Sequence, residues 1–198
     1  NEISTICKAY GIRSYLTLNS IIYDEELQEM QNIVDTAKES GISAIIASDP
    51  SVISYAAQKG VEVHLSTQCN VTNIEAVKWY SRYADVIVLA RELNLQQIKQ
   101  IVDAINSYDI RGPSGNLIAI EIFVHGALCM AISGKCYLSL HSMNSSANRG
   151  ACLQICRRRY DVTDKETGTV LEVDNEYIMS PKDLCTIGIL DQILATGV

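Results

Sequence analysis

The stretch AIIASDPSVISYAAQKGVEVHLS, residues 44–66, decides the fold class of this chain. It opens with a short apolar run, continues with an amphipathic segment that ends at Gly60, and closes with a second apolar run. Continuous apolar runs of this length are typical of strands that are buried on both faces. A strand, a helix and a strand in this order predict a βαβ unit, with parallel strands and a right-handed crossover.

The same alternation continues on both sides of this stretch. Strands are expected at residues 14–19, 44–48, 61–66, 85–90 and 117–126, with a weaker one at 176–180. Helices are expected at residues 24–40, 51–59, 73–83 and 94–105, and a last one from about 181 or 189 to the end. Repeated βα units of this kind predict either a (β/α) TIM-type barrel or an open doubly wound sheet.

Polar residues at the ends of several expected strands favour the barrel. They are Asn19, Gln68, Arg91, Glu92 and His125. Polar groups at the carboxyl ends of many different strands are typical of a barrel active site. No Gly-x-Gly-x-x-Gly sequence follows any strand, so a dinucleotide fold has no support. A barrel needs about eight strands, so the barrel is expected to be incomplete here.

The alternation stops after Gly126, which suggests three regions. Residues 1–126 form the βα repeats, residues 127–176 form a Cys-rich insertion on the C-terminal face, and residues 177–198 return to the barrel. Within the insertion, residues 160–175 show the alternation and the turn residues of a β-hairpin.

Composition limits the classes of function. The chain has 198 residues and a net charge of −7, so any contact with nucleic acid needs a local basic patch. No apolar run is long enough to span a bilayer, and the start does not resemble a signal peptide, so we expect no membrane contact and a cytoplasmic protein. In a reducing compartment its seven cysteines are not expected to form disulfides.

Five of these cysteines mark the candidate site: Cys129, Cys136, Cys152, Cys156 and Cys185. Thiolates are preferred ligands of zinc and of iron–sulfur clusters. None of the pairs has the two-residue spacing of a zinc knuckle, which favours the cluster over zinc. Two alternatives stay open at this point. The thiols can be buried core residues, or Cys129 can act as a nucleophile beside His125.

A basic cluster lies in the same region. Arg149, Arg157, Arg158 and Arg159 are followed by Tyr160, which could offer a stacking surface. The arginines either balance nearby acids in a solvated turn or hold a phosphate or carboxylate through bidentate contacts. His64 lies inside an expected strand and is interpreted as a satisfied core histidine.

Four motifs in this region carry a family resemblance. They are E-x-F-V-H-G-A-L-C at 121–129, S-G-K-C-Y-L-S at 133–139, A-N-R-G-A-C-L-Q-x-C-R at 147–157 and S-P-K-D-L-C at 180–185. Together with T-L-N at 17–19, S-T-Q at 66–68 and L-A-R-E-L at 89–93, they resemble peptidase family U32, the collagenase-like proteases. The resemblance covers nearly the whole chain. It implies a barrel that starts at the family's third strand and stops before its last one.

The resemblance also implies two kinds of activity. The family name implies a hydrolase acting on peptides, whereas several members are implicated in hydroxylation of a tRNA wobble uridine, a ribosomal RNA cytidine or the ubiquinone ring. Those members carry cysteine-bound iron–sulfur clusters, and the tRNA branch depends on prephenate. Matched by motif, the cluster ligands here would be Cys129, Cys136, Cys152 and Cys185, with Cys156 as the alternative. In an incomplete barrel the thiols are expected to be free of metal.

The residue chemistry favours hydroxylation of RNA, with tRNA uridine as the substrate. Thiolates beside arginines suit a cluster enzyme with an anionic partner, whereas peptide hydrolysis needs an activated nucleophile and an oxyanion site. A collagenase-like peptidase and a zinc-stabilised RNA-binding module are the alternatives. We assign catalytic roles to His125, Arg91 and Glu92. We assign binding of a cofactor or of a small anionic co-substrate such as prephenate to Asn19, Gln68, Arg149 and Arg157.

Overall fold

The structure is a computed structural model that describes residues 2–158, 160–172 and 183–198. These residues form two compact units, which are treated separately below. The first unit runs to Ile122 and includes Ile189–Val198, and the second unit is Phe123–Gly188. None of the helices in the described part of the chain has the length and apolarity that crossing a membrane requires.

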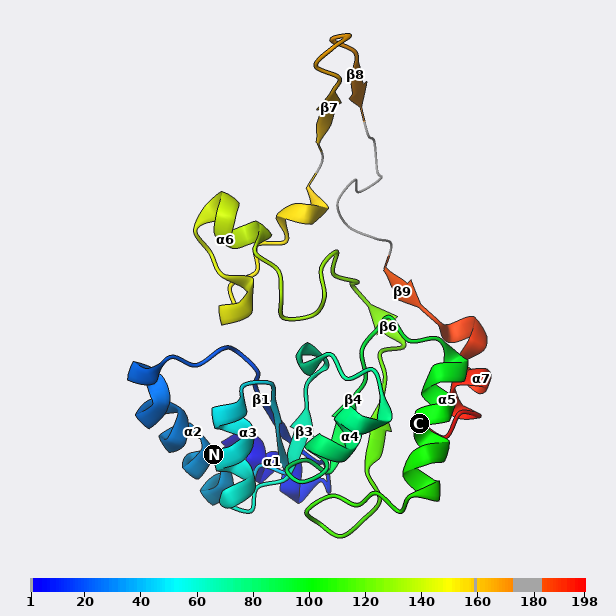
Figure 1. Ribbon diagram of the computed structural model, residues 1–198. Helices are drawn as coiled ribbons and strands as arrows, with labels where there is room; N and C mark the ends of the chain where they lie inside the picture. Colours follow the sequence, from blue (N-terminus) through cyan, green and yellow to red (C-terminus); the bar gives the residue numbers. More distant parts are fainter. Residues whose placement is uncertain (1, 159, 173–182) are drawn as a thin grey trace. The chain divides into compact units, whose positions relative to one another are not determined.

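The first unit is built on a five-stranded parallel sheet (Figure 1). Its strands lie side by side in chain order: β1 (Tyr15–Leu18), β2 (Ala44–Ala47), β3 (Val63–Leu65), β4 (Val86–Val88) and β5 (Ala119–Glu121). The parallel sheet predicted from the sequence is therefore confirmed, and each strand lies within its expected range. The further prediction that this sheet is part of a barrel stays a prediction. The expected strand at 176–180 lies outside the described residues.

Helices connect these strands as the sequence predicted. They are α2 (Leu27–Ser40), preceded by the short 3-10 helix η1 (Asp24–Glu26), then α3 (Pro50–Gln58), α4 (Ile74–Tyr80) and α5 (Leu95–Ser107). The expected asparagine caps are present, because the side chains of Asn73 and Asn94 accept hydrogen bonds from backbone N–H groups at 3.0 and 2.9 Å. The helix α1 (Glu2–Ala9) was not predicted, and α7 (Leu190–Leu194) matches the helix expected near residue 189.

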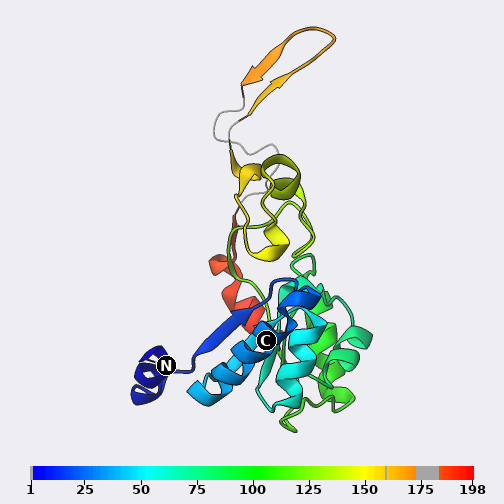
Figure 2. The ribbon, with the colours of Figure 1, turned by 90° about the vertical axis from the view of Figure 1, so that its left-hand side faces the viewer.

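The core lies between the sheet and these helices (Figure 2). Alternate strand residues such as Ile45, Leu65 and Ile87 are fully buried and pack with Val34 of α2 and Val77 of α4. Because side chains alternate between the two faces of a strand, the residues between them point to the opposite face of the sheet. That opposite face carries the charged residues described below.

The second unit has little regular structure. Its strands β6 (His125–Gly126) and β9 (Leu184–Cys185) pair antiparallel, and β7 (Asp161–Thr163) pairs with β8 (Val170–Glu172) in the predicted hairpin. Between them lie α6 (Leu138–Met143) and the 3-10 helices η3 (Ala147–Arg149) and η4 (Ile155–Arg157). Asp164 closes the hairpin turn by accepting hydrogen bonds from the N–H groups of Glu166 and Thr167, at 2.8 and 3.2 Å. That this unit is an insertion into a barrel stays a prediction.

Candidate functional site

Polar groups gather at the carboxyl ends of β1, β2 and β3. The Ser48 hydroxyl lies 2.7 Å from the backbone carbonyl oxygen of Asn19 and 2.9 Å from the side-chain oxygen of Gln68. Each of the three residues follows a different strand, and the parallel sheet brings the strand ends to one edge. The structure therefore joins Asn19 and Gln68, two of the predicted site residues, through Ser48. Asn19 takes part in this contact through its backbone.

Arg91 and Glu92 follow the next strand, β4, at the same edge of the sheet. Arg91 is half-buried and Glu92 is exposed. The turn before them is fixed by the Thr67 hydroxyl, which donates to the backbone carbonyl of Leu89 at 3.2 Å. The predicted gathering of polar residues after successive strands thus extends from β1 to β4.

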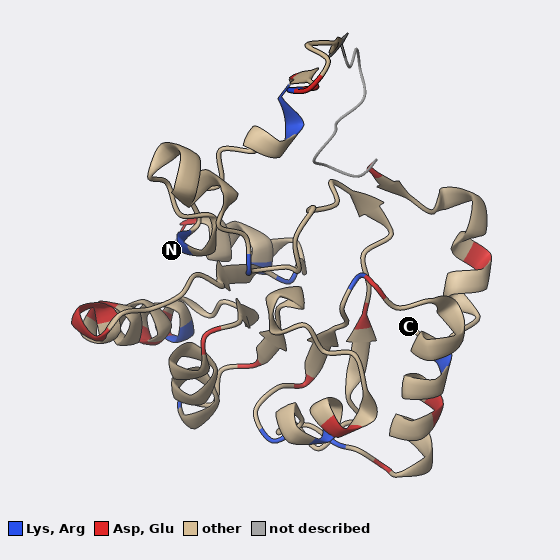
Figure 3. Ribbon diagram, turned by 45° about the horizontal axis from the view of Figure 1, so that its top comes forward, with Lys and Arg blue, Asp and Glu red and all other residues tan. Residues whose placement is uncertain are grey.

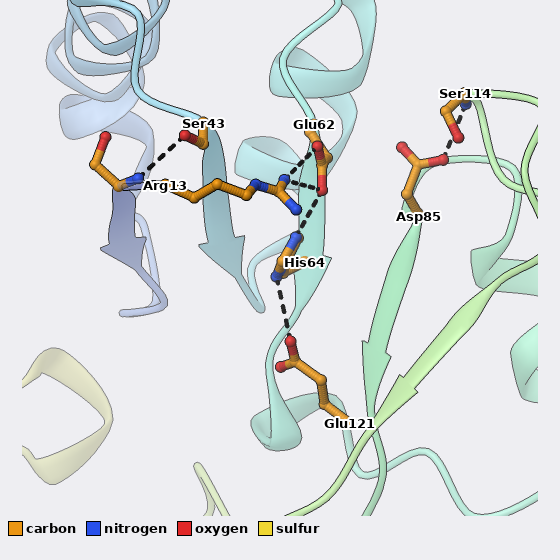
Figure 4. A network of polar contacts seen from close by, with 8 residues as sticks. Arg13, Ser43, Glu62, His64, Asp85, Ser114 and Glu121 are labelled. Atoms are coloured by element: carbon orange, nitrogen blue, oxygen red, sulfur yellow. Dashed lines mark hydrogen bonds and ion pairs between the residues drawn. The ribbon is translucent and has the colours of Figure 1, made fainter. Parts of the chain in front are cut away.

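A charged network that was not predicted from the sequence lies on the face of the sheet opposite the core helices, and it runs from Arg13, before β1, to Glu121 at the carboxyl end of β5 (Figure 4). The Arg13 guanidinium donates to both carboxylate oxygens of Glu62 at 2.7 Å. The His64 Nε2 atom lies 2.8 Å from Glu62 Oε1, and its Nδ1 atom lies 3.8 Å from Glu121 Oε1. The ring centre of Tyr15 lies 5.0 Å from that of His64, so the imidazole is enclosed by charged and aromatic groups.

This network confirms the interpretation of His64 as a satisfied core histidine. Its exposed fraction is 3%, and its ring is bonded to Glu62. Burial acts to raise the pKa of the Glu62 carboxyl, but the hydrogen bonds from Arg13 and His64 outweigh it and hold that pKa below its ordinary value. The sequence did contain a signal, because Glu62 and His64 alternate with Val63 and Leu65 and so must face away from the helices.

In the second unit, His125 lies directly opposite Cys185 in the β6–β9 pair. The Thr186 N–H donates to the carbonyl of Val124 at 3.0 Å, so these neighbours form a hydrogen-bonded pair. The alternating pattern of an antiparallel ladder makes His125 and Cys185 a non-hydrogen-bonded pair, whose side chains share a face at the closer spacing. The sequence suggests Cys129 as the thiol partner of His125, whereas the strand register gives that place to Cys185.

The five thiols of the second unit are all free. Cys129, Cys152 and Cys185 are exposed, and Cys136 and Cys156 are half-buried. This donor chemistry fits a group bound by thiolates. Their placement does not yet match such a group, because no three His, Cys, Asp or Glu side chains of residues 2–158, 160–172 and 183–198 are grouped to hold a metal ion. The thiols would have to move closer together to share one ion or cluster.

The predicted arginine cluster is divided in the structure. Arg157 is largely buried and pairs with Asp183, with 2.6 Å between Nη2 and Oδ1. Arg149 ends η3 and is half-buried, and Arg158 is exposed just beyond η4. Figure 3 shows all Lys and Arg residues of the described chain in blue. Arg159 lies outside the described residues. An anionic ligand that used Arg157 would therefore have to compete with a carboxylate that is already bound there.

The chain is similar to one protein family and to several known proteins. The family model described as "Peptidase family U32" matches residues 1–198. A relative from Porphyromonas gingivalis named "Collagenase" is 56% identical over the whole chain, which covers 48% of that relative. The "23S rRNA 5-hydroxycytidine C2501 synthase" of Escherichia coli is 35% identical, over the whole chain and 28% of the relative.

A third relative, "tRNA hydroxylation protein P1" of Bacillus subtilis, is 34% identical over 96% of the chain and 44% of its own length. No solved structure matches this chain. The chain therefore spans at most about half the length of these relatives, whose names state both collagenase activity and RNA hydroxylation.

Proposed function

This chain belongs to peptidase family U32, and we propose that the protein it forms is an RNA hydroxylation enzyme that acts on a uridine of tRNA. The observation that carries the proposal is the set of five free thiols within one unit, Phe123–Gly188. Such a set suits binding of a redox-active metal group. It exceeds what a peptidase needs, which is one activated nucleophile with its base and an oxyanion site.

We propose that an iron–sulfur cluster is the cofactor and that Cys129, Cys136, Cys152 and Cys185 are its ligands, with Cys156 as the alternative to Cys152. When bound, such a cluster supplies one-electron chemistry. Zinc is the alternative metal, and it would make the second unit a structural RNA-binding module without redox chemistry. The free state of all five thiols supports a metal-binding role over a disulfide framework.

The substrates are proposed from polar groups of each unit taken by itself. A small anionic co-substrate such as prephenate would bind at the strand-end groups Asn19, Gln68 and Arg91, with Glu92 and His125 in catalytic roles. RNA phosphates would contact the predicted arginine cluster through its exposed member Arg158, because an acidic chain needs a local basic patch for such contact. Relatives with names that state tRNA or rRNA hydroxylation align with nearly all of this chain, which supports RNA as the substrate. A tRNA substrate places the protein in the cytoplasm.

A collagenase-like peptidase is the second candidate, and two observations favour it. Collagenase-named relatives reach 56% and 49% identity, above the hydroxylation relatives. In addition, the register of β6 and β9 sets the exposed Cys185 thiol beside the His125 imidazole, which is the pairing that a cysteine nucleophile and its base require. Peptide substrates would then replace RNA.

The two candidates are separated by one set of variants. The protein is expressed in bacterial cells that lack tRNA uridine hydroxylation, and 5-hydroxyuridine is measured in digested tRNA by mass spectrometry. In parallel, the purified protein is incubated with gelatin. Hydroxylation that is lost in Cys129→Ser and Cys136→Ser supports our proposal. Gelatin cleavage that survives both substitutions but fails in His125→Ala, without any tRNA product, refutes it in favour of the peptidase.

Metal analysis distinguishes the remaining alternative. Protein prepared without oxygen is expected to be brown, with iron and sulfide in comparable amounts and broad absorbance near 400 nm. Stoichiometric zinc without iron in the same preparation, together with RNA binding but no modified nucleoside, would instead identify the zinc-stabilised module.

A further inference from the structure

A small cavity lies between α3 and α4 in the first unit. Its volume is about 110 Å³, whereas sites that enclose a whole drug-sized ligand measure about 300–1,000 Å³. A cavity of this size therefore suits one ring of a larger ligand. None of the described side chains that line it is acidic, although the chain carries a net charge of −7. The lining residues are Pro50, Ile53, Ser54, Trp79, Tyr80 and Tyr83.

Three aromatic rings stand together in the wall of this cavity. The ring centres of Trp79 and Tyr83 lie 5.6 Å apart at an angle of 50°, and Tyr80 meets Trp79 edge-on at 4.7 Å. These contacts hold the Trp79 ring in place, and yet 49% of the residue is exposed. A large ring that is fixed and half exposed can bind a second flat ring with little loss of its own freedom.

Arg82 adds a positive charge to this aromatic group. Its guanidinium carbon lies 5.2 Å from the ring centre of Trp79 and 5.9 Å from that of Tyr83, and its Nε atom donates to the Trp79 carbonyl at 3.0 Å. Among the described residues no carboxylate pairs with Arg82 and no group accepts a hydrogen bond from its Nη atoms. Lys78 differs, because its ammonium lies 2.7 Å from a Glu75 carboxylate oxygen. Arg82 is therefore the cation that an anionic ligand would reach here.

Tyr80 connects the cavity to the strand-end groups of the same unit. Its hydroxyl is hydrogen-bonded to the Cys69 thiol, and burial together with this thiol raises the pKa of Tyr80, so the hydroxyl stays protonated. The Cys69 Sγ atom lies 3.6 Å from the backbone carbonyl oxygen of Ser48. Ser48 is the residue that joins Asn19 and Gln68. The cavity and the strand-end groups are thus linked by direct contacts.

Two classes of ligand bind aromatic groups of this kind. A proline-rich peptide packs its rings against aromatic side chains, but those rings carry no charge for Arg82 to bind. Single-stranded RNA offers an unpaired base for the aromatic rings and a phosphate directly beside that base. Because Trp79 and Arg82 occur together, RNA accounts for both residues, whereas the peptide accounts for one.

We propose that this cavity binds an unpaired base of single-stranded RNA, which packs against Trp79 and Tyr83 while Arg82 contacts the adjoining phosphate. The site accepts any base, because stacking uses the flat face that every base has. That this RNA is the substrate of the enzyme rests on the proposed function, whereas the cavity itself belongs to the first unit and needs no bound metal. A base held here would fix the strand beside the strand-end groups.

Trp79 makes the test direct, because it is the single tryptophan of the chain. The protein is titrated with an oligouridylate of about ten nucleotides, a length within the usual range of such sites, and tryptophan fluorescence is recorded. The same titration is made with duplex RNA, with a ribose-phosphate oligomer that lacks bases, and with oligoproline. Oligouridylate should quench Trp79, and the duplex and the abasic oligomer should bind at least about fivefold more weakly, because neither offers an unpaired base.

Four variants separate the contribution of the ring from that of the charge. Tyr83→Leu should weaken oligouridylate binding about fivefold or more, and Tyr10→Leu, at an exposed tyrosine outside the cavity, is its matched control. Arg82→Gln should lower the slope of log Kd against log salt by about 0.7, the contribution of one phosphate contact in a single strand. Arg111→Gln, which loses an ion pair with Asp109 outside the cavity, should keep the wild-type slope.

Trp79→Leu removes the exposed ring itself and is followed with a dye-labelled oligouridylate. It should weaken binding at least as much as Tyr83→Leu, and circular dichroism checks that each variant is folded. If Trp79→Leu does not fold, Tyr83→Leu decides. Equal affinity of Tyr83→Leu and Tyr10→Leu would overturn the inference. An abasic oligomer that binds as tightly as oligouridylate, or oligoproline that quenches Trp79 more strongly, would overturn it as well.

The inference and the proposed function can fail separately. Oligouridylate that binds at Trp79, in a protein that leaves tRNA uridines unmodified, supports the inference and refutes the hydroxylation. Hydroxylation of tRNA by the wild type, without any quenching of Trp79 by oligouridylate, refutes the inference and leaves the hydroxylation in place.

Discussion

Substitution of Glu62 tests the charged network on the face of the sheet opposite the core helices. Glu62→Gln keeps the shape of the side chain but removes the charge that binds Arg13 and His64. Glu62→Ala removes the whole side chain that both Arg13 and His64 contact. Glu121→Gln, at the longer distance of 3.8 Å from the His64 ring, is the matched control on the same face.

The expected loss of unfolding free energy depends on how exposed the two partners of Glu62 are. The Arg13 side chain is 54% exposed, so its ion pair is worth only about 0.5 kcal/mol. His64 is 3% exposed, and loss of a charged acceptor there in exchange for a neutral amide costs about 1 kcal/mol. Glu62→Gln should therefore destabilise the protein by about 1–1.5 kcal/mol at pH 7. Glu62→Ala removes the hydrogen-bond partner of the His64 Nε2 atom and should cost about 2–3 kcal/mol. Glu121→Gln should cost less than about 0.5 kcal/mol.

The measurement uses urea unfolding followed by tryptophan fluorescence. Trp79, which belongs to the first unit, is the single tryptophan of the chain, so the signal reports on the unit that contains the network. The folded pKa of Glu62 is lowered from its ordinary 4.5. Its contribution is therefore complete above that value and is lost as the pH falls through the folded pKa. The difference between wild type and Glu62→Gln should shrink as the pH falls through the folded pKa of Glu62. A Glu62→Ala variant as stable as Glu121→Gln, or a difference that grows in acid, would refute the reasoning.

Three further predictions concern single contacts. Lys59→Met should raise the pKa of Asp35, because the hydrogen bond from Lys59 is the main cause that holds that pKa below its ordinary value. An NMR titration of the Asp35 carboxyl measures the change, and an unchanged pKa would contradict the prediction. Asp164→Ala should remove the cross-strand contacts of β7 with β8 in NMR spectra, because the turn loses its acceptor for two backbone N–H groups, whereas Asp164→Asn should keep them. The double variant Cys129→Ser, Cys136→Ser should lose at least half of the iron bound by the wild type, and undiminished iron would remove both residues from the ligand set.

Much of the first unit could be predicted from the sequence because its determinants are local. Short apolar runs predicted the first four strands, and the longer run at 117–126 contains β5 and also β6. The asparagines before α4 and α5 marked the helix starts at Asn73 and Asn94. Chain order then predicted the order of the sheet, since successive βα units usually place their strands side by side.

The network of Arg13 with Glu62 could not be predicted in the same way. The two residues are 49 positions apart, and their contact depends on the register of strands that the sequence does not state. The pairing of β6 with β9 could not be predicted either. Each strand has only two residues, and so short a segment carries almost no periodic signal. The sequence did show that Glu62 and His64 alternate with the apolar Val63 and Leu65. This alternation identifies the face of the sheet on which they lie, but not the residues that they contact.

The sequence predicted which residue types form the candidate site, but only some of the contacts between them. The strand-end contacts of Asn19 and Gln68 follow from the parallel topology, so the sequence was sufficient for them. The cysteines were identified as a set, but the sequence could not say that Cys185 faces His125 or that serine side chains hold the neighbours of Cys152. Such contacts depend on loops, where no repeat restricts the backbone.

The pairing of β6 with β9 also has a consequence for how the chain folds. Neighbouring strands of the parallel sheet are joined by segments of 15 to 30 residues, so the sheet can grow one βα unit at a time through near-local contacts. By contrast, His125 must find Cys185 about 60 residues later, which closes a longer loop at a greater entropic cost for only a few backbone hydrogen bonds. The Cys185 thiol should therefore reach His125 late in folding, after the sheet has formed, when an incoming metal could still take part in closing the loop.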